Sequence, residues 1–140
     1  IGMGLRAIRD AETVIIVYGD LVFNSAAIKN LNLKKSCIII DDINMGSDEV
    51  GCIIDKDGNL ANMMYDLPIK WGQIAVFRGH ELEVLKELCW DKRNYRKFGF
   101  EIINRIIERG GSFRCIRNED IKIVDIDTSK DIQTAIGILT

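Results

Sequence analysis

The sequence has few of the residues that build metal–thiolate, disulfide or membrane-spanning structures. Its 140 residues include one histidine, one proline and four cysteines, and no two cysteines form a Cys-x-x-Cys pair. A structural zinc site is therefore not expected, and the dispersed cysteines are typical of buried free thiols in a reducing cytoplasm. No apolar run approaches the roughly 20 residues that a membrane-spanning helix needs. We therefore expect a cytoplasmic chain without a membrane span.

An excess of charge of one sign is also lacking. The formal net charge is -2, and acidic and basic residues are interspersed along the chain. The basic, aromatic segment 90–98 is shorter than the stripe typical of nucleic-acid binding, and it fits a solvated connection between two helices. We therefore expect no nucleic-acid partner.

Short apolar runs alternate with helical patterns along the chain. The runs "TVIIVY" (13–18), "SCIIID" (36–41) and "GQIAVFRG" (72–79) predict buried strands. Apolar residues recur at helical spacing in 80–90 and 98–111, and in a final stripe at positions 132, 135, 136 and 139. The tripeptide "KDG" (56–58) predicts a hairpin within an insert at about 48–65. With 47% apolar residues, we expect one α/β domain over residues 1–140, with a Rossmann-like, mixed and mostly parallel sheet flanked by helices.

Carboxylates follow three of the predicted strands. They are Asp20, the Asp41–Asp42 pair, and Asp125 with Asp127 in "VDIDT". In open α/β sheets, ligands bind outside the carboxyl ends of the strands. Side chains two residues apart on a strand point to the same side, so Asp125 and Asp127 would repel unless a cation such as Mg²⁺ joined them. Alternatively, Asp127 caps the final helix, Asp125 is solvated and Asp20 is a turn residue. The local sequence leaves both interpretations open.

Two of these segments resemble the nucleotidyltransferases that couple a nucleoside triphosphate to a phosphorylated sugar or polyol. The segments are "VIIVYGDLVF" and, about a hundred residues later, "IKIVDIDTSKDIQTA". In that family one strand ends in Gly-Asp, and a late strand ends in a short acidic motif before a Thr-x-x-Asp-Leu helix start. Gly19-Asp20 and the run 125–128 match these elements, with Asp131-Ile132 in place of Asp-Leu. The resemblance is closest to small cytidylyltransferases such as those acting on phosphocholine.

The resemblance implies a fold, a reaction and a set of site residues. The fold is that of the nucleotide-diphospho-sugar transferases. The reaction is Mg²⁺-dependent attack of an acceptor phosphate on a nucleoside triphosphate, with CTP favoured, and release of pyrophosphate. The implied metal ligands are Asp20, Asp125 and Asp127. The implied catalytic residues are Asp20, Asp127 and Lys70, and the implied cofactor-binding residues are Gly19 and Asp20.

The acceptor site is less sharply defined by the sequence. Lys70, in "LPIKW", is the candidate contact for the acceptor phosphate, although a loop lysine is commonly just solvated. Tyr65 and Trp71 are able to pack against a sugar, to hold a quaternary ammonium group, or simply to pack in the core.

One family element is not found in these residues. The glycine-rich nucleotide loop, of the Leu-Ala-Ala-Gly-x-Gly-x-Arg kind, has no match here. We therefore expect the C-terminal portion of a catalytic domain, incomplete at its N-terminus and inactive alone. An exposed sheet edge would then favour a homo-oligomer or swapped dimer. The alternatives are a non-catalytic or degenerate structural domain that assembles with another chain, and a metal-dependent glycosyltransferase relative.

Overall fold

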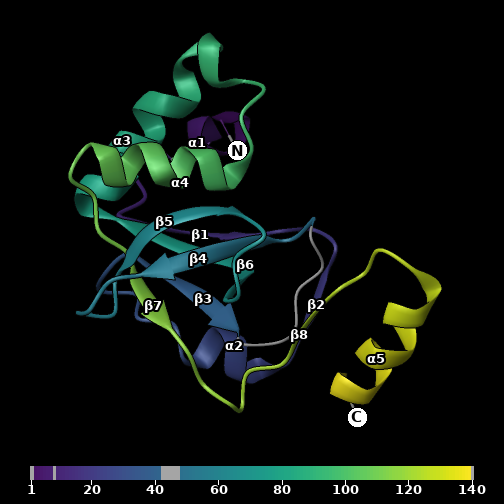
Figure 1. Ribbon diagram of the computed structural model, residues 1–140. Helices are drawn as coiled ribbons and strands as arrows, with labels where there is room; N and C mark the ends of the chain where they lie inside the picture. Colours follow the sequence, from purple (N-terminus) through teal and green to yellow (C-terminus); the bar gives the residue numbers. More distant parts are fainter. Residues whose placement is uncertain (1, 8, 42–47, 140) are drawn as a thin grey trace.

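The computed structural model describes residues 2–7, 9–41 and 48–139 (Figure 1). The described helices are α1 (Gly2–Ala7), α2 (Ser25–Lys29), α3 (Gly79–Trp90), α4 (Gly99–Glu108) and α5 (Ser129–Leu139), with a 3₁₀ turn, η1, at Lys92–Asn94. The described strands are β1 (Thr13–Val17), β2 (Leu21–Phe23), β3 (Cys37–Asp41), β4 (Val50–Ile54), β5 (Leu60–Tyr65), β6 (Lys70–Arg78), β7 (Arg114–Ile116) and β8 (Ile123–Asp125).

A six-stranded sheet is built around the long strand β6. Its order is β5-β4-β6-β3-β7, and β1 also pairs with β6. Strands β2 and β8 lie apart from this sheet and form a two-stranded antiparallel ribbon. Strands β4 and β5 pair as the hairpin expected around Gly58, whose φ of 82° is readily adopted only by glycine.

The mixed α/β class is confirmed, but the expectation of mostly parallel strands is wrong. Among the pairs of described strands, β3–β7 is parallel, whereas β6 pairs antiparallel with β1, β3 and β4. The remaining pairs, β4–β5 and β2–β8, are also antiparallel. Runs such as "CIIID" are apolar because β3 is covered on both faces, and that burial does not fix the direction of a neighbouring strand.

Helices cover both faces of the sheet and enclose two hydrophobic cores. Helices α1, α3 and α4 lie over one face, and α2 lies on the other (Figure 1). Alternate residues of β3 point to opposite faces, as the pleat of a strand requires. Ile38 and Ile40 therefore join the core under α3 and α4, while Cys37 and Ile39 join the core with α2.

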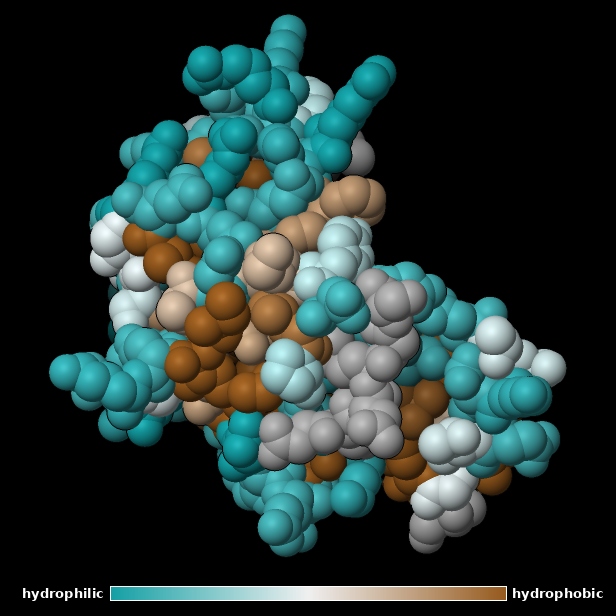
Figure 2. All heavy atoms as spheres, in the orientation of Figure 1, coloured by the Kyte–Doolittle hydropathy of each residue, from teal (hydrophilic) through white to brown (hydrophobic). Residues whose placement is uncertain are grey.

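The last helix, α5, packs less tightly than its sequence suggests. It contacts β2 and β8, and Ala135 is its one buried residue. The other members of its apolar stripe, Ile132, Ile136 and Leu139, are 48%, 51% and 69% exposed. Hydrophobic side chains accordingly reach the surface on the side of the molecule where α5 lies (Figure 2). None of the helices in the described ranges combines the length and the apolarity that crossing a bilayer requires.

A pair of matched substitutions tests the buried position of β3. Ile38 is fully buried and Ile53, on β4, is 42% exposed. We expect Ile38→Val to lower the free energy of unfolding by about 1 kcal/mol, because it leaves a methyl-sized void in a packed core. Ile53→Val should change it by less than about 0.5 kcal/mol. Urea unfolding measures both, and equal losses would contradict the burial of Ile38 in the core.

Candidate functional site

The β2–β8 ribbon brings together two segments that lie about a hundred residues apart in the sequence. Leu21 pairs with Asp125, and the Ile126 amide donates a 3.0 Å hydrogen bond to the Asp20 carbonyl. At the other end of the ribbon, the Asn24 side chain donates to the Asp120 carbonyl at 2.8 Å and accepts from the Lys122 amide at 3.2 Å. The pairing therefore places the Gly-Asp turn beside the acidic motif of "VDIDT".

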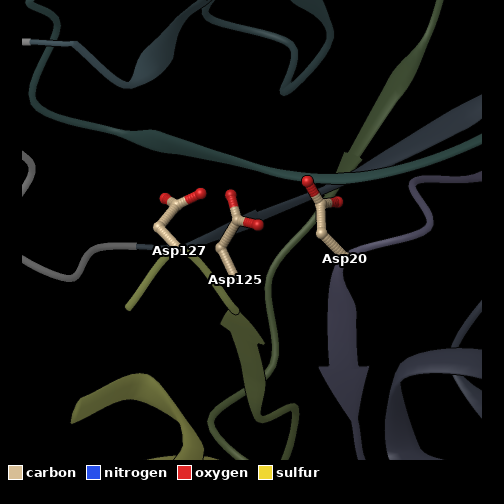
Figure 3. Close-up of side chains that lie close together, drawn as sticks. All are labelled: Asp20, Asp125 and Asp127. Carbon is tan, nitrogen blue, oxygen red and sulfur yellow. The ribbon is translucent and has the colours of Figure 1, made fainter. Parts of the chain in front are cut away.

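Three carboxylates meet at the end of this ribbon. Asp20, Asp125 and Asp127 each offer an oxygen, and these oxygens lie within 4.8 Å of one another. The three side chains point the same way, with Asp20 coming from the turn before β2 and the other two from the end of β8 (Figure 3). Asp20 and Asp127 are exposed, and Asp125 is half-buried between them.

Asp125 lies in an environment that disfavours its negative charge. Burial raises its pKa above the ordinary value, and the negative charges of Asp20 and Asp127 raise it further, while a hydrogen bond from Gln73 opposes the shift. Its Oδ2 accepts this bond from the Gln73 amide, whereas its buried Oδ1 has no hydrogen-bond partner among the described residues. A buried acceptor without a partner beside two like charges fits a site for a hard cation with oxygen ligands.

The side chain of Asp127 is not used to cap helix α5. The cap is built by Asp131, whose Oδ2 accepts from the amides of Asp127 (3.2 Å) and Thr128 (2.7 Å) and from the Thr128 hydroxyl (2.8 Å). These bonds lower the pKa of Asp131. The alternative that Asp127 caps α5 is therefore not what the structure shows, and the Asp127 carboxylate is turned to the cluster instead.

The other residues predicted from the sequence lie around this cluster. Lys70 begins β6, and its ammonium group donates to the Glu49 carboxylate. Gly19 is exposed in the turn before Asp20, and a Cβ there would meet no atom within 4 Å. Asp41 lines a neighbouring cavity of about 220 Å³ but is outside the three-carboxylate group, and Asp42 lies outside the described residues.

A second cavity, of about 210 Å³, opens beside the carboxylates and is rich in aromatic rings. Tyr18 and Trp71 pack edge to face at 5.4 Å, as do Tyr65 and Phe100 at 5.3 Å, and Phe98 stacks on Phe100. Carboxylates also line it. We call this cavity the aromatic pocket. Its lining residues are Tyr18, Asp48, Glu49, Val50, Tyr65, Lys70, Trp71, Gln73, Phe98, Phe100, Asp125 and Asp127.

Several members of this pocket were not identified from the sequence. Phe98 and Phe100 begin a helix far along the chain, and no local pattern connects them with Tyr18. Tyr18 directly precedes the Gly-Asp turn, which is the one signal that pointed toward it. Gln73 carried no signal, because its contact with Asp125 depends on a local distortion of β6.

The largest of the cavities described here and the four cysteines are weaker candidates for a functional site. A larger cavity, of about 640 Å³, lies at the opposite end of β1, where Glu81 already accepts from the Ser36 hydroxyl and the Ser112 amide. The four cysteines are free thiols. Burial raises the pKa of Cys52 to about 12 and that of Cys115 to about 11, so both stay protonated at neutral pH and are poor nucleophiles.

Comparison with known proteins gives structural likeness without sequence likeness. No family model matches the chain. No curated protein sequence matches it either. Solved structures do match. An inositol-1-phosphate CTP transferase from T. maritima superposes with a TM-score of 0.70 at 8% identity, over 96% of this chain and 59% of that one.

Two further neighbours have related names. A CTP:phosphocholine cytidylyltransferase from Streptococcus pneumoniae gives a TM-score of 0.67 at 11% identity, over 99% of this chain and 63% of that one. A nucleoside-diphosphate-sugar pyrophosphorylase from Vibrio cholerae gives 0.59 at 9% identity, over 96% and 61%.

The likeness at these identities establishes the fold. The chain spans about three fifths of the length of each neighbour, between 59% and 63%. Residues 2–7, 9–41 and 48–139 thus adopt an α/β arrangement that these nucleotidyltransferases contain within a longer chain.

Proposed function

We propose that this chain carries the metal-binding and acceptor-binding part of a nucleotidyltransferase, which transfers a nucleotidyl group from a nucleoside triphosphate to a phosphorylated small molecule and releases pyrophosphate. One observation carries the proposal. In a fold shared with such enzymes, the β2–β8 ribbon gathers Asp20, Asp125 and Asp127, and the last two of these also line the aromatic pocket. A reaction between two phosphate groups needs positive charge and positioning more than covalent catalysis. At this site a cation held by the carboxylates would supply the positive charge, and the pocket would position the acceptor.

Asp20, Asp125 and Asp127 would hold Mg²⁺, and Gly19 leaves the turn open to phosphate oxygens. When bound, the ion neutralises negative charge on phosphate oxygens. The chain itself contributes positioning. Lys70 lines the aromatic pocket, and its pairing with Glu49 holds it there until a phosphate replaces the carboxylate as its partner. Its three N–H groups suit a phosphate as well as a carboxylate.

The aromatic pocket favours an acceptor with a cationic head group over a neutral sugar. Electron-rich ring faces and carboxylates both attract a quaternary or primary ammonium ion. Tyr65 and Phe98 are 45% and 64% exposed at this pocket, although rings of this size are usually covered. We therefore favour a phosphorylated amino alcohol as acceptor and CTP as donor. CTP stands in the names of two of the structural neighbours, and phosphocholine in the name of one of them, whereas the other is named for the neutral inositol 1-phosphate.

The wider assembly follows from the same proposal. We infer that residues 1–140 are one domain, the C-terminal portion of the catalytic unit, and that they act in the cytoplasm, where their thiols stay reduced.

Among the described strands, β1 pairs with β6 alone, and its Ile15 and Val17 are 39% and 38% exposed. This edge is able to pair with another chain, so self-association is proposed across it.

Activity should need more than these residues. No glycine-rich nucleotide loop occurs in the sequence, so we expect the 140-residue chain alone to release no pyrophosphate from CTP and phosphocholine with Mg²⁺. A coupled pyrophosphate assay measures this, and multiple turnovers by the chain alone would contradict the expectation. A chain that binds neither metal nor acceptor would instead favour the non-catalytic alternative.

The carboxylate cluster predicts opposite effects of one substitution with and without metal. Asp125 has a raised pKa, so its ionisation above that pKa destabilises the folded state, and the loss grows as pH rises through it. Asp125→Asn should therefore raise the melting temperature at pH 7 without metal. It should also abolish the stabilisation by Mg²⁺, which for the native chain is about 1.4 kcal/mol when the free ion is at ten times its dissociation constant.

Differential scanning fluorimetry with and without Mg²⁺ makes this comparison. The matched control is Asp10→Asn, which removes an exposed carboxylate outside the cluster and should leave the Mg²⁺ effect intact. Equal Mg²⁺ stabilisation of the native chain and of Asp125→Asn would rule out this metal site.

The aromatic pocket predicts discrimination between two ligands of equal shape. Phosphocholine should bind about 2- to 5-fold tighter than 3,3-dimethylbutyl phosphate, its neutral isostere, because a cation–π contact at a partly exposed ring contributes about 0.5–1 kcal/mol. Tyr65→Leu should reduce this preference. Tyr95→Leu, at a ring that is 60% exposed and does not line the pocket, should not. Ligand titration by NMR measures both, and equal affinity for the two ligands would favour a neutral acceptor.

A further inference from the structure

We propose that Gln73 is a positioning residue for the metal site, held in a bulge of β6 so that its amide fixes the orientation of Asp125. The inference rests on the proposed function, because it concerns the same three carboxylates. Gln73 is uncharged and belongs to none of the sequence motifs described above. We do not propose it as a metal ligand. Its role is to decide which oxygen of Asp125 is available to the cation.

The backbone of β6 is distorted at this residue. Along β3 and β6, Ile38 pairs with Ala75 and Ile40 pairs with Trp71, so a step of two residues on β3 is matched by four on β6. The extra residues form a bulge that includes Gln73, whose φ is 58°. Glutamine is not favoured in this left-handed region, and such a conformation costs about 1–3 kcal/mol. A strained residue that persists beside a charged cluster is a candidate for a functional role.

Neighbouring elements hold the bulge in place. The preceding residue is Gly72, where a Cβ would lie 3.1 Å from side-chain atoms of both Ile39 and Ile123. The sheet and the β2–β8 ribbon therefore approach each other closely at this glycine. The Tyr18 amide also donates a 3.4 Å hydrogen bond to the Gln73 carbonyl. The bulge thus touches both segments that supply the carboxylates, the Gly-Asp turn and the end of β8.

The chemistry of the contact suits a metal site. A carboxylate only accepts hydrogen bonds, so the amide nitrogen of Gln73 faces Asp125 Oδ2. The bond occupies that oxygen and leaves Oδ1 without a hydrogen-bond partner among the described residues. A lysine or arginine in this position would bring a positive charge that competes with the cation, whereas a neutral amide orients the carboxylate without neutralising it. Groups that hydrogen-bond to metal ligands commonly set metal affinity in this way.

Removing the amide should weaken metal binding without lowering the stability of the metal-free chain. In Gln73→Gly the backbone strain is relieved, so the metal-free chain should melt at the same or a higher temperature. Mn²⁺, used as the probe, should bind about 10- to 100-fold more weakly, as is typical when the hydrogen-bond partner of a metal ligand is lost. Titration of the 140-residue chain with Mn²⁺, followed by water-proton relaxation, gives the affinity, and thermal unfolding gives the stability. A residue with a merely structural role would not show this combination.

Two further variants separate the amide from the strain. Gln73→Met keeps the length of the side chain and the strained backbone but cannot donate, so it should lose Mn²⁺ affinity as Gln73→Gly does, without the gain in stability. Asp66→Gly relieves strain at the other described non-glycine residue with positive φ, 62°, and should leave Mn²⁺ affinity unchanged. Native affinity in both Gln73 variants would overturn the proposal and leave the metal site standing. If the native chain and Asp20→Asn bind Mn²⁺ equally, the proposed metal site itself is wrong, and the role of Gln73 with it.

Discussion

The pairing of β2 with β8 is the contact on which the candidate site depends. Each strand has three residues, and two-stranded ribbons of this length are marginal on their own in water. The ribbon is nevertheless held at one end by the Asn24 side chain, at the other by the bond from Ile126 to Asp20, and along its side by α5. Because Leu21 is in register with Asp125, the turn that carries Asp20 is fixed beside the end of β8. Sliding the ribbon by one residue would turn Asp125 away from its partners, since successive side chains of a strand alternate between faces.

The site concentrates unfavourable interactions that the rest of the molecule offsets. Three carboxylates lie together, Asp125 is partly desolvated, and Gln73 has a left-handed backbone. Two well-packed cores on either face of the sheet supply the compensating stability, with Ile38, Ile39, Phe113 and other large side chains fully buried. Like charges and an unpaired acceptor at the mouth of an aromatic pocket have a common explanation if a cation and an anionic ligand complete the site. In a domain with only a structural role, the clustered carboxylates and the unpaired acceptor would lower the stability of the fold without any compensating function.

The sequence predicted the elements of this fold better than their arrangement. Buried runs and helical periodicity located β1, β3, β6, α3 and α4, because burial and periodicity are local properties of the chain. Strand direction was mispredicted, since an apolar run reports coverage on both faces and not the neighbour beside it. The nearness of Asp20, Asp125 and Asp127 was expected from the motif resemblance, and the structure brings them together, while their roles stay predictions. Strand β2, the aromatic partners Phe98 and Phe100, and the Gln73 bulge depend on tertiary contacts, and no local pattern encodes them.

The central claim is that the carboxylates gathered by the ribbon bind a divalent cation. Anomalous diffraction from crystals of the chain grown with Mn²⁺ tests it most directly, because the signal locates the ion without any assumption about activity. The account predicts a peak between Asp20, Asp125 and Asp127, with Oδ1 of Asp125 among its ligands and Gln73 still bonded to Oδ2. Strong Mn²⁺ peaks elsewhere in the molecule, with none at these carboxylates, would contradict it.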